Sequence, residues 1–512
     1  MKYSLSLLIP VLLTLQMAFA AKGAVTQDAI EIEYATKVVG EGETEQVTVR
    51  FATTQARKVT IELFKGTQKI VGTTADIPAG RGNKKVALAM PASLVNANDY
   101  RWVATLGNTT MTGNALDQKT VSGVIANNVP QGSGSIAPNY AYLVHEGRVD
   151  LTNPASSELI WPGNSVTARF QGTSISADIE AGGSDPTWHS AALGVLIDGD
   201  SATYKQIPLV PGTRKTIVLA SGLANKNHSI KLYRDAETVF PIQFLGFTLD
   251  AGKGLLQPRD VPALKLQFYG NSVTCGGSAD PTHPTNLDPS SDDGWGGSIF
   301  TNFAGILNNT IPSQHVITCK GGAGVSNGFI PYYAKDFINN WHFNIWNPTS
   351  TTTSSWEPKN SAWDNAKYRA DVVIIEFGQN DGDNAGFIPA YKNLLSMIRT
   401  AHPTADIVGV AGFMPWGCAN GPRIQTAVNE MNDAKLHYLY TGCTGSNGGS
   451  HPKPADHAAA VYGNPGIKNF LYDSVLPDPI PGSSPPLSSS ETPSSSSSSY
   501  LLLQTRQVLI LV

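Results

Sequence analysis

Short runs of alternating apolar and polar residues fill the first part of the chain. Val47–Phe51, Val59–Leu63 and Arg101–Leu106 each alternate, and clusters of Gly and Asn separate them. A period of two is typical of strands that bury one face. Several such strands within about 100 residues predict an Ig-like or fibronectin-like β-sandwich over residues 24–128. This segment carries no pattern that indicates catalysis, and it is typical of a spacer or a binding module.

A second all-β region follows. Residues 127–138 have the Gly, Pro and Asn content of a linker. After them Ser165–Phe170, Ser174–Ile179 and Gly194–Gly199 again have the pattern of short strands. We therefore expect a second, jelly-roll-like β-sandwich over residues 139–255.

The pattern changes at about residue 260. Leu264–Gly270 alternates, whereas Val372–Ile375 and Ile407–Val410 are continuous apolar runs, typical of strands buried on both faces. Apolar residues in Tyr391–Ile398 and Ile424–Met431 recur at helical spacing. Strands alternating with helices predict an α/β domain with a parallel sheet over residues 260–478. In such sheets the active site lies beyond the carboxyl ends of the strands.

Both ends of the chain have the composition of non-globular segments. Lys2, an apolar stretch over Leu5–Met17 and the Ala18-Phe19-Ala20 sequence predict a secretory signal peptide at residues 1–20. Residues 479–512 begin with a Ser/Pro-rich run and end in a short apolar segment interrupted by Arg506. We interpret this as a disordered tail, and the alternative is a signal for lipid anchoring.

Composition excludes several partners. The 512 residues carry a formal charge of −4, and 15% of them are charged. This balance, without a run of Lys or Arg, argues against nucleic acid as the main partner. After the signal peptide, no segment has the roughly 18 apolar residues of a transmembrane helix. A secreted, loop-rich protein is the class that remains.

The four cysteines are expected to form disulfides, because an exported protein meets an oxidising environment. We favour Cys275–Cys319 and Cys418–Cys443, since each pair closes a loop of moderate length. A metal site is the alternative, but the sequence has no C-x-x-C motif. Three N-x-S/T sequons, at Asn108, Asn227 and Asn308, are glycosylation candidates in a eukaryotic host.

Three short segments carry residues suited to acyl transfer. Ser272 follows the strand that ends at Gly270, on a turn that can present a nucleophile or cap a helix. Asn380, in Gly378-Gln379-Asn380-Asp381, can donate to an oxyanion or form an Asx turn. His451 precedes the last predicted helix and can serve as a general base.

Together these segments resemble the SGNH (GDSL-type) hydrolases across residues 260–478. The β-region before them resembles the sandwich of carbohydrate esterase family 2, which extends the likeness to residues 139–478. The motifs that carry it are Gly147-Arg148-Val149, Trp161-Pro162-Gly163, Phe170-Gln171-Gly172-Thr173, Leu196-Ile197-Asp198-Gly199 and His228-Ser229-Ile230-Lys231-Leu232. The resemblance implies deacetylation of plant polysaccharides such as xylan and glucomannan.

The same resemblance implies the role of each residue. Ser272 matches the nucleophile, His451 the base and Asn380 the side-chain oxyanion donor. The backbone donor falls in Lys320–Gly324, where we assign Gly322, with Gly321 as the alternative. The superfamily often places Asp three residues before the histidine, a position that holds Gly448 here. Some members of carbohydrate esterase family 2 resemble this chain in lacking that acid, and they work with a Ser–His dyad. In this chain Asp456 is the alternative candidate for the acid, and we do not favour it.

Tryptophans are the other feature suited to carbohydrate. Trp341, Trp346, Trp356 and Trp363 cluster in a polar insertion, where they could contact sugar rings or only fix the loop. Trp416, just past a strand end, is the better sugar-binding candidate, whereas Trp161 is expected in the core.

The sequence therefore predicts a secreted serine esterase that acts on acetylated polysaccharide and needs no metal or cofactor. The alternatives are an SGNH esterase of lipid or aryl esters and a catalytically inactive carbohydrate-binding protein.

Overall fold

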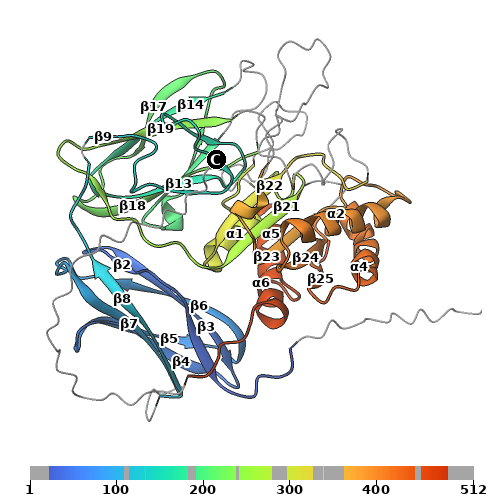
Figure 1. Ribbon diagram of the computed structural model, residues 1–512, viewed down its shortest axis with the longest axis horizontal. Helices are drawn as coiled ribbons and strands as arrows, with labels where there is room; N and C mark the ends of the chain where they lie inside the picture. The colour runs from blue at the N-terminus through green and yellow to red at the C-terminus, as the bar shows by residue number, and fades with distance from the viewer. Residues whose placement is uncertain are drawn as a thin grey trace, which may run out of the picture.

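The computed structural model describes residues 22–108, 115–132, 134–182, 192–237, 241–279, 297–326, 338, 363–443 and 451–482. The expected signal peptide, Gly448, most of the expected tail, and Trp341, Trp346 and Trp356 lie outside these residues. The described chain forms two strand-rich regions and one α/β region, which lie at the lower left, upper left and right of Figure 1.

The first region consists of two sheets that share one core. β1 (Ala29–Ala35), β3 (Thr44–Thr53) and β6 (Gly80–Ala89) form an antiparallel sheet in the order β1-β3-β6. The second sheet has the order β2-β8-β7-β4-β5, built from β2 (Val38–Val39), β4 (Arg57–Lys65), β5 (Gln68–Ile77), β7 (Ala97–Gly107) and β8 (Asp117–Ala126). Alternating residues of both sheets meet around the buried Trp102.

The second region also has two sheets around a common core. One has the order β10-β13-β18-β15-β16, with β20 beside β13, and the other the order β11-β12-β19-β14-β17, with β9 beside β19. Their bounds are β9 (Ser135–Ile136), β10 (Val144–Glu146), β11 (Val149–Asp150), β12 (Ser157–Leu159), β13 (Ser165–Gly172), β14 (Ile175–Ala181), β15 (Ala192–Ile197), β16 (Lys205–Pro208), β17 (Arg214–Ala220), β18 (Lys226–Arg234), β19 (Ile242–Leu249) and β20 (Leu255–Leu256).

Two segments that composition assigns to a linker and a tail are part of the folded protein. Gln131 exchanges backbone hydrogen bonds with Leu255, and β9 pairs with β19, so the expected linker already belongs to the second region. At the other end, Lys119 donates to the backbone oxygen of Ile480, and the Gly482 amide donates to Asp117. These contacts depend on residues distant in sequence, and composition does not reveal them.

The third region is a parallel sheet covered on both faces by helices. The strand order is β22-β21-β23-β24-β25. Its strands are β21 (Lys265–Gly270), β22 (Gln314–Cys319), β23 (Val372–Glu376), β24 (Asp406–Ala411) and β25 (Leu436–Tyr440). Its helices are α1 (Phe303–Thr310), α2 (Phe387–Ala401), α3 (Pro415–Ala419), α4 (Gly421–Glu430), α5 (Pro454–Tyr462) and α6 (Ile467–Phe470), followed by the π-helical turn η5 (Leu471–Val475).

The apolar patterns explain this layering. Tyr391, Leu394 and Ile398 of α2 pack with Ile424 and Val428 of α4 on one face of the sheet. Residues of α1, α5 and α6 pack on the other face. The predicted strands β21, β23 and β24 and helices α2 and α4 are therefore confirmed. The pattern did not reveal β22 and β25, whose apolar runs are interrupted by the histidines at 315 and 437.

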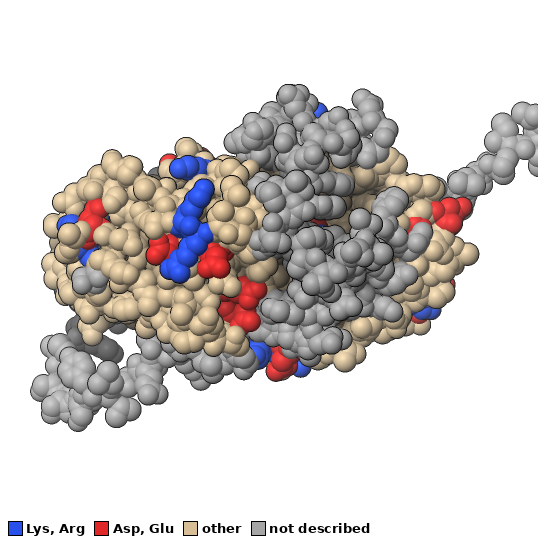
Figure 2. Space-filling view, turned by 90° about the horizontal axis from the view of Figure 1, so that it is seen from above, with Lys and Arg blue, Asp and Glu red and all other residues tan. Residues whose placement is uncertain are grey.

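Charged side chains are sparse on the face seen in Figure 2. Lys and Arg form one short row, a few acidic groups lie near it, and most of the described surface there is uncharged. Within the described residues, no helix is long and apolar enough to cross a membrane.

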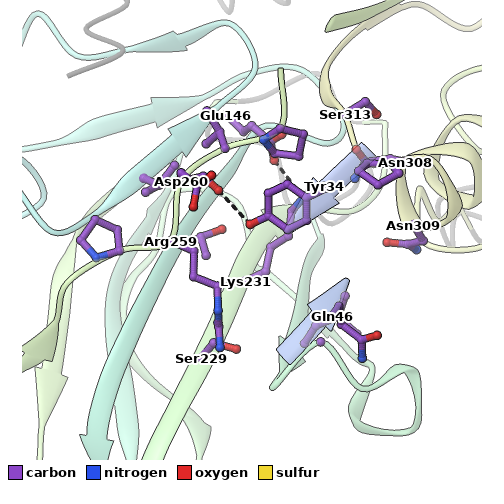
Figure 3. A pocket seen from close by; sticks show the side chains of 18 of the residues that line it. Tyr34, Gln46, Glu146, Ser229, Lys231, Arg259, Asp260, Asn308, Asn309 and Ser313 are labelled. Carbon is purple, nitrogen blue, oxygen red and sulfur yellow. Dashed lines mark hydrogen bonds and ion pairs between the residues drawn. The ribbon is translucent and has the colours of Figure 1, made fainter. Parts of the chain in front are cut away.

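The three regions meet around a cavity of about 340 Å³ (Figure 3). Tyr34 of the first region donates its hydroxyl to the backbone oxygen of Asp260, in the segment that leads to the α/β region. Arg259, beside it, pairs with Glu43 and Glu45. None of the expected catalytic residues lines this cavity. Its contacts fix the regions relative to one another.

Candidate active site

Ser272 stands on a tight turn at the carboxyl end of β21. The Asn271 side chain accepts from the Val273 amide at 2.9 Å, and the Cys275 amide donates to the backbone oxygen of Asn271 at 3.0 Å. A Cβ at Gly270 would collide with Oγ1 of Thr274, so only glycine allows the chain to turn this sharply. Ser272 is 5% exposed.

His451 lies against this serine. Its Nε2 is 2.7 Å from the Oγ of Ser272. A Cβ at Gly277 would lie 3.1 Å from both the His451 ring and the backbone oxygen of Ser272, so this glycine leaves room for the imidazole. Burial lowers the pKa of His451, and the negative charge of Glu237 opposes that effect. A lowered pKa keeps the imidazole neutral near pH 7, the form that can accept a proton.

The two expected oxyanion donors follow the strands on either side of β21. Gly322, with φ of 75°, comes after β22, and Asn380 comes after β23. Asn380 donates one amide hydrogen to the backbone oxygen of Ala323 at 2.8 Å, which joins the two loops. The Gly321 amide already donates to Glu237 at 2.8 Å, so Gly322 is the better candidate of the two glycines.

Asp381 also joins the loop after β22 to the loop after β23. Its carboxylate accepts from the amides of Val325 and Ser326 at 2.7 to 3.1 Å and from the Ser326 hydroxyl at 3.0 Å. Sequence reasoning gave this residue no role, although it directly follows Asn380.

Glu376, at the end of β23, is a second acid that the sequence reasoning missed. It accepts from Oγ1 of Thr274 at 2.9 Å and from the amide of Gln379, and it is fully buried. Burial raises the pKa of Glu376 to about 8, with hydrogen bonds from Thr274 and Asn271 opposing the rise. At neutral pH its carboxyl, next to the turn that carries Ser272, is therefore mostly protonated.

The carboxylate of Asp456 bonds to the backbone at the start of its own helix, α5. It accepts from the Lys453 amide at 2.9 Å and caps the start of α5. This bond explains why the residue does not replace the acid that the superfamily often places before the histidine.

Both expected disulfides are present, which confirms the predicted pairing. Cys275–Cys319 joins the turn after Ser272 to the end of β22, one residue before Lys320. Cys418–Cys443 joins α3 to the segment after β25. The described residues contain no group of three or more His, Cys, Asp or Glu that could hold a metal.

The tryptophans fall into two classes. Trp161 and Trp363 are buried in the core, and the Arg148 guanidinium stacks over the Trp363 ring. Trp363 therefore does not present a face to a sugar. Trp416 is 49% exposed on α3. Its neighbour Gly417 packs so closely that a Cβ there would collide with the side chain of Gln379, which places α3 against the Asn380 loop.

The sequons differ in accessibility. Asn227 is 2% exposed, and its side-chain amide donates to Glu41 and Asn128, which leaves no room for a glycan. The burial of its side chain therefore disfavours Asn227 among the three glycosylation candidates. Asn108 and Asn308 are half-buried.

Two family models match parts of the chain. Residues 145–258 match the carbohydrate esterase 2 N-terminal model, and residues 30–118 match a porphyranase-associated domain. The first match covers the second strand-rich region, whose motifs carried the resemblance in the sequence. The second match assigns the first region to a type that the sequence reasoning did not identify.

Two curated relatives are esterases by name. The cellulase/esterase CelE of Acetivibrio thermocellus is 28% identical over 338 residues, covering 62% of this chain and 38% of the relative. The acetylxylan esterase/glucomannan deacetylase of Cellvibrio japonicus is 21% identical over 338 residues, covering 64% of this chain and 87% of the relative. The chain thus spans well under half the length of the first relative.

Solved structures show the same fold. A family two carbohydrate esterase from Cellvibrio japonicus superposes with a TM-score of 0.53 at 20% identity, covering 64% of this chain and 94% of that one. An acetyl xylan esterase from Butyrivibrio proteoclasticus gives 0.53 at 19% identity, covering 64% and 96%. The chain therefore resembles carbohydrate esterase family 2, with the N-terminal domain of that family at residues 145–258.

Proposed function

We propose that the protein is a serine esterase that removes acetyl groups from polysaccharide. The observation that carries the proposal is the 2.7 Å contact between Nε2 of His451 and Oγ of Ser272. This contact lies at the carboxyl edge of a parallel sheet, where Gly322 and Asn380 follow the flanking strands. A nucleophile, a base and two donors at one edge are the parts that acyl transfer requires.

The first half of the reaction forms an acetyl-enzyme. His451 accepts the proton of Ser272 as Oγ attacks the acetyl carbonyl carbon. The oxygen of that carbonyl becomes negative and is held by the amides of Ser272 and Gly322 and by the side chain of Asn380. The C–O bond to the sugar then breaks, and His451 returns the proton to the departing sugar oxygen.

The second half releases acetate by the same route. Water gives a proton to His451 and attacks the acetyl carbon. The bond to Oγ of Ser272 then breaks, and the serine recovers its proton from His451.

The substrate class rests on the relatives and on the surface. One curated relative is named for acetylxylan and glucomannan, and one family two structure from Clostridium thermocellum is a complex with cellohexaose. The exposed ring of Trp416 suits contact with the face of a neutral sugar ring. Secretion follows from the expected signal peptide and is part of the proposal.

Acetate release from acetylated xylan and acetylated glucomannan tests this function. Esters of long-chain fatty acids serve as the comparison. We expect acetate from at least one polysaccharide and little activity on the long-chain esters. Hydrolysis of the long-chain esters alone would instead identify an esterase of lipids.

A further inference from the structure

The second strand-rich region contacts the α/β region through the segment that follows β18. Asp235 is fully buried there, and its carboxylate accepts from the Ser298 hydroxyl at 3.0 Å and from the amides of Ile299 and Phe300 at 3.0 and 3.3 Å. The same carboxylate also accepts from the Tyr204 hydroxyl of its own region at 2.6 Å. The position of this segment on the α/β region is thereby fixed.

Glu237, two residues later, contacts the candidate oxyanion loop directly. Its Oε1 accepts from Nζ of Lys320 at 2.6 Å and from the Gly321 amide at 2.8 Å. The side chains of Lys320 and Glu237 are only 13% and 23% exposed, so water weakens this pair less than it would at the surface. The carboxylate therefore bonds to both residues before Gly322.

Gly321 leaves space for the Glu237 carboxylate against the Lys320–Gly324 loop. A Cβ on Gly321 would lie 3.0 Å from Oε2 of Glu237, so any larger residue would press against the acid. Cys319 anchors the same loop at its start through the disulfide to Cys275, and Asp381 anchors it at Val325 and Ser326. Glu237 anchors the loop between those two points at Lys320 and Gly321, and Asn380 does so at Ala323.

We propose that Glu237 is a positioning residue of the esterase site, contributed by the preceding β-region, which fixes the backbone at Lys320–Gly322. This inference rests on the proposed function. The negative charge of Glu237 also favours the protonated form of His451, which is the form that the base adopts during the reaction.

Within the described residues, two titratable groups act electrostatically with His451. Glu237 lies on the segment after β18, and His457 lies on α5. Lys320, which follows β22, is paired with Glu237. Burial lowers the pKa of His457 to about 3, so that ring is neutral. Among these groups only Glu237 supplies a negative charge that favours protonated His451.

Glu237→Gln separates charge from geometry. The amide oxygen of Gln can still accept from the Gly321 amide, but the negative charge is gone. We expect kcat on a small aryl acetate to fall severalfold with little change in KM, and the acidic limb of kcat/KM to move to lower pH, because His451 loses the charge that favours its protonated form. Glu237→Ala removes both contributions, and we expect kcat/KM to fall by about 10- to 100-fold.

Two further variants sharpen the test. Lys320→Met leaves the negative charge of Glu237 unopposed and should move the acidic limb to higher pH, the opposite direction. Asp198→Asn is the matched control, because Asp198 accepts from the Ser229 amide and from His228, each at 2.8 Å, at the other end of β18. It should leave kcat, KM and the pH profile unchanged.

NMR titration of His451, assigned with His451→Ala, measures the same charge effect without any activity. A lower pKa of His451 in Glu237→Gln than in the wild type is the expected result, and it would stand even if acetylated xylan proved not to be a substrate. If Glu237→Gln is folded, as thermal unfolding shows, and has both the wild-type pKa of His451 and the wild-type kcat, the proposal is overturned. An active wild type with an unaffected Glu237→Gln refutes this inference alone, whereas an inactive wild type refutes the proposed function.

Discussion

The Nε2 atom of His451 lies 2.7 Å from the Oγ of Ser272, although 179 residues separate them in the chain. The fold brings them together because β21 ends at the serine turn and α5 begins just after the histidine. Gly277, which has no side chain, leaves room for the His451 ring beside Ser272.

Asn380→Ala should reduce kcat by about 100-fold with a small change in KM, because an oxyanion donor acts mainly in the transition state. Asn380 also donates to the backbone oxygen of Ala323, so thermal unfolding must show that the variant is folded. Steady-state kinetics on an aryl acetate measures the effect. Asn393→Ala, at an exposed position on α2, is the control, and equal kinetics for both variants would exclude Asn380 as a donor.

Removal of the Cys275–Cys319 disulfide should affect both stability and rate. The bond closes a loop of 44 residues, and its loss is expected to reduce the free energy of unfolding by about 4 kcal/mol. Because it joins the Ser272 turn to the strand before Lys320, kcat should fall as well. Denaturant unfolding and kinetics of Cys275→Ser/Cys319→Ser measure the two effects.

The second disulfide provides the comparison. Cys418→Ser/Cys443→Ser should lower stability slightly less, since its loop spans 25 residues. This bond fixes α3, which carries Trp416, so we expect KM for polysaccharide to change more than kcat. A larger loss of kcat in this variant than in the first would contradict the assigned roles.

Much of the site was predictable because its signals are local. The apolar runs of β23 and β24, the helical spacing of α2 and α4, and the turn after β21 are each encoded within a few residues. Ser272 was singled out on that turn, the role of His451 came from the resemblance to the SGNH hydrolases, and the disulfide pairing came from the loop lengths. Glu237 was not predictable, because its role depends on a contact with Gly321, which lies 84 residues away in sequence. Strands β9, β22 and β25 were missed for the same reason, since their pairing partners rather than their own patterns define them.

Glu376→Gln tests the buried acid. Burial raises the folded-state pKa of Glu376 to about 8, above its ordinary value of 4.5, so the folded protein holds a proton that the unfolded chain releases. This stabilisation is fully present below pH 4.5 and is lost as pH rises through 8.

The wild type should therefore lose stability between about pH 4.5 and about pH 8, and Glu376→Gln should lose less over that range. Thermal unfolding across this range measures the difference. Glu430→Gln, which removes an exposed acid paired with Lys392, should follow the wild type. Parallel curves for wild type and Glu376→Gln would show that Glu376 does not titrate there.

Trp416→Ala should raise KM for acetylated polysaccharide severalfold and leave KM for an aryl acetate nearly unchanged, because an exposed ring can stack on a sugar but is not needed by a small ester. Tyr462→Ala, at a similarly exposed aromatic on α5, should leave both values unchanged. An equal rise of KM for both substrates in Trp416→Ala would argue against a sugar-binding surface.

The central claim is that Ser272 is the nucleophile of an acetyl esterase. The most direct measurement compares acetate release from acetylated xylan and glucomannan by the wild type and by folded Ser272→Ala, with Ser396→Ala on the exposed face of α2 as the control. We predict release by the wild type and by Ser396→Ala, and a loss of at least about 1,000-fold in Ser272→Ala. Wild-type rates in Ser272→Ala would contradict the account.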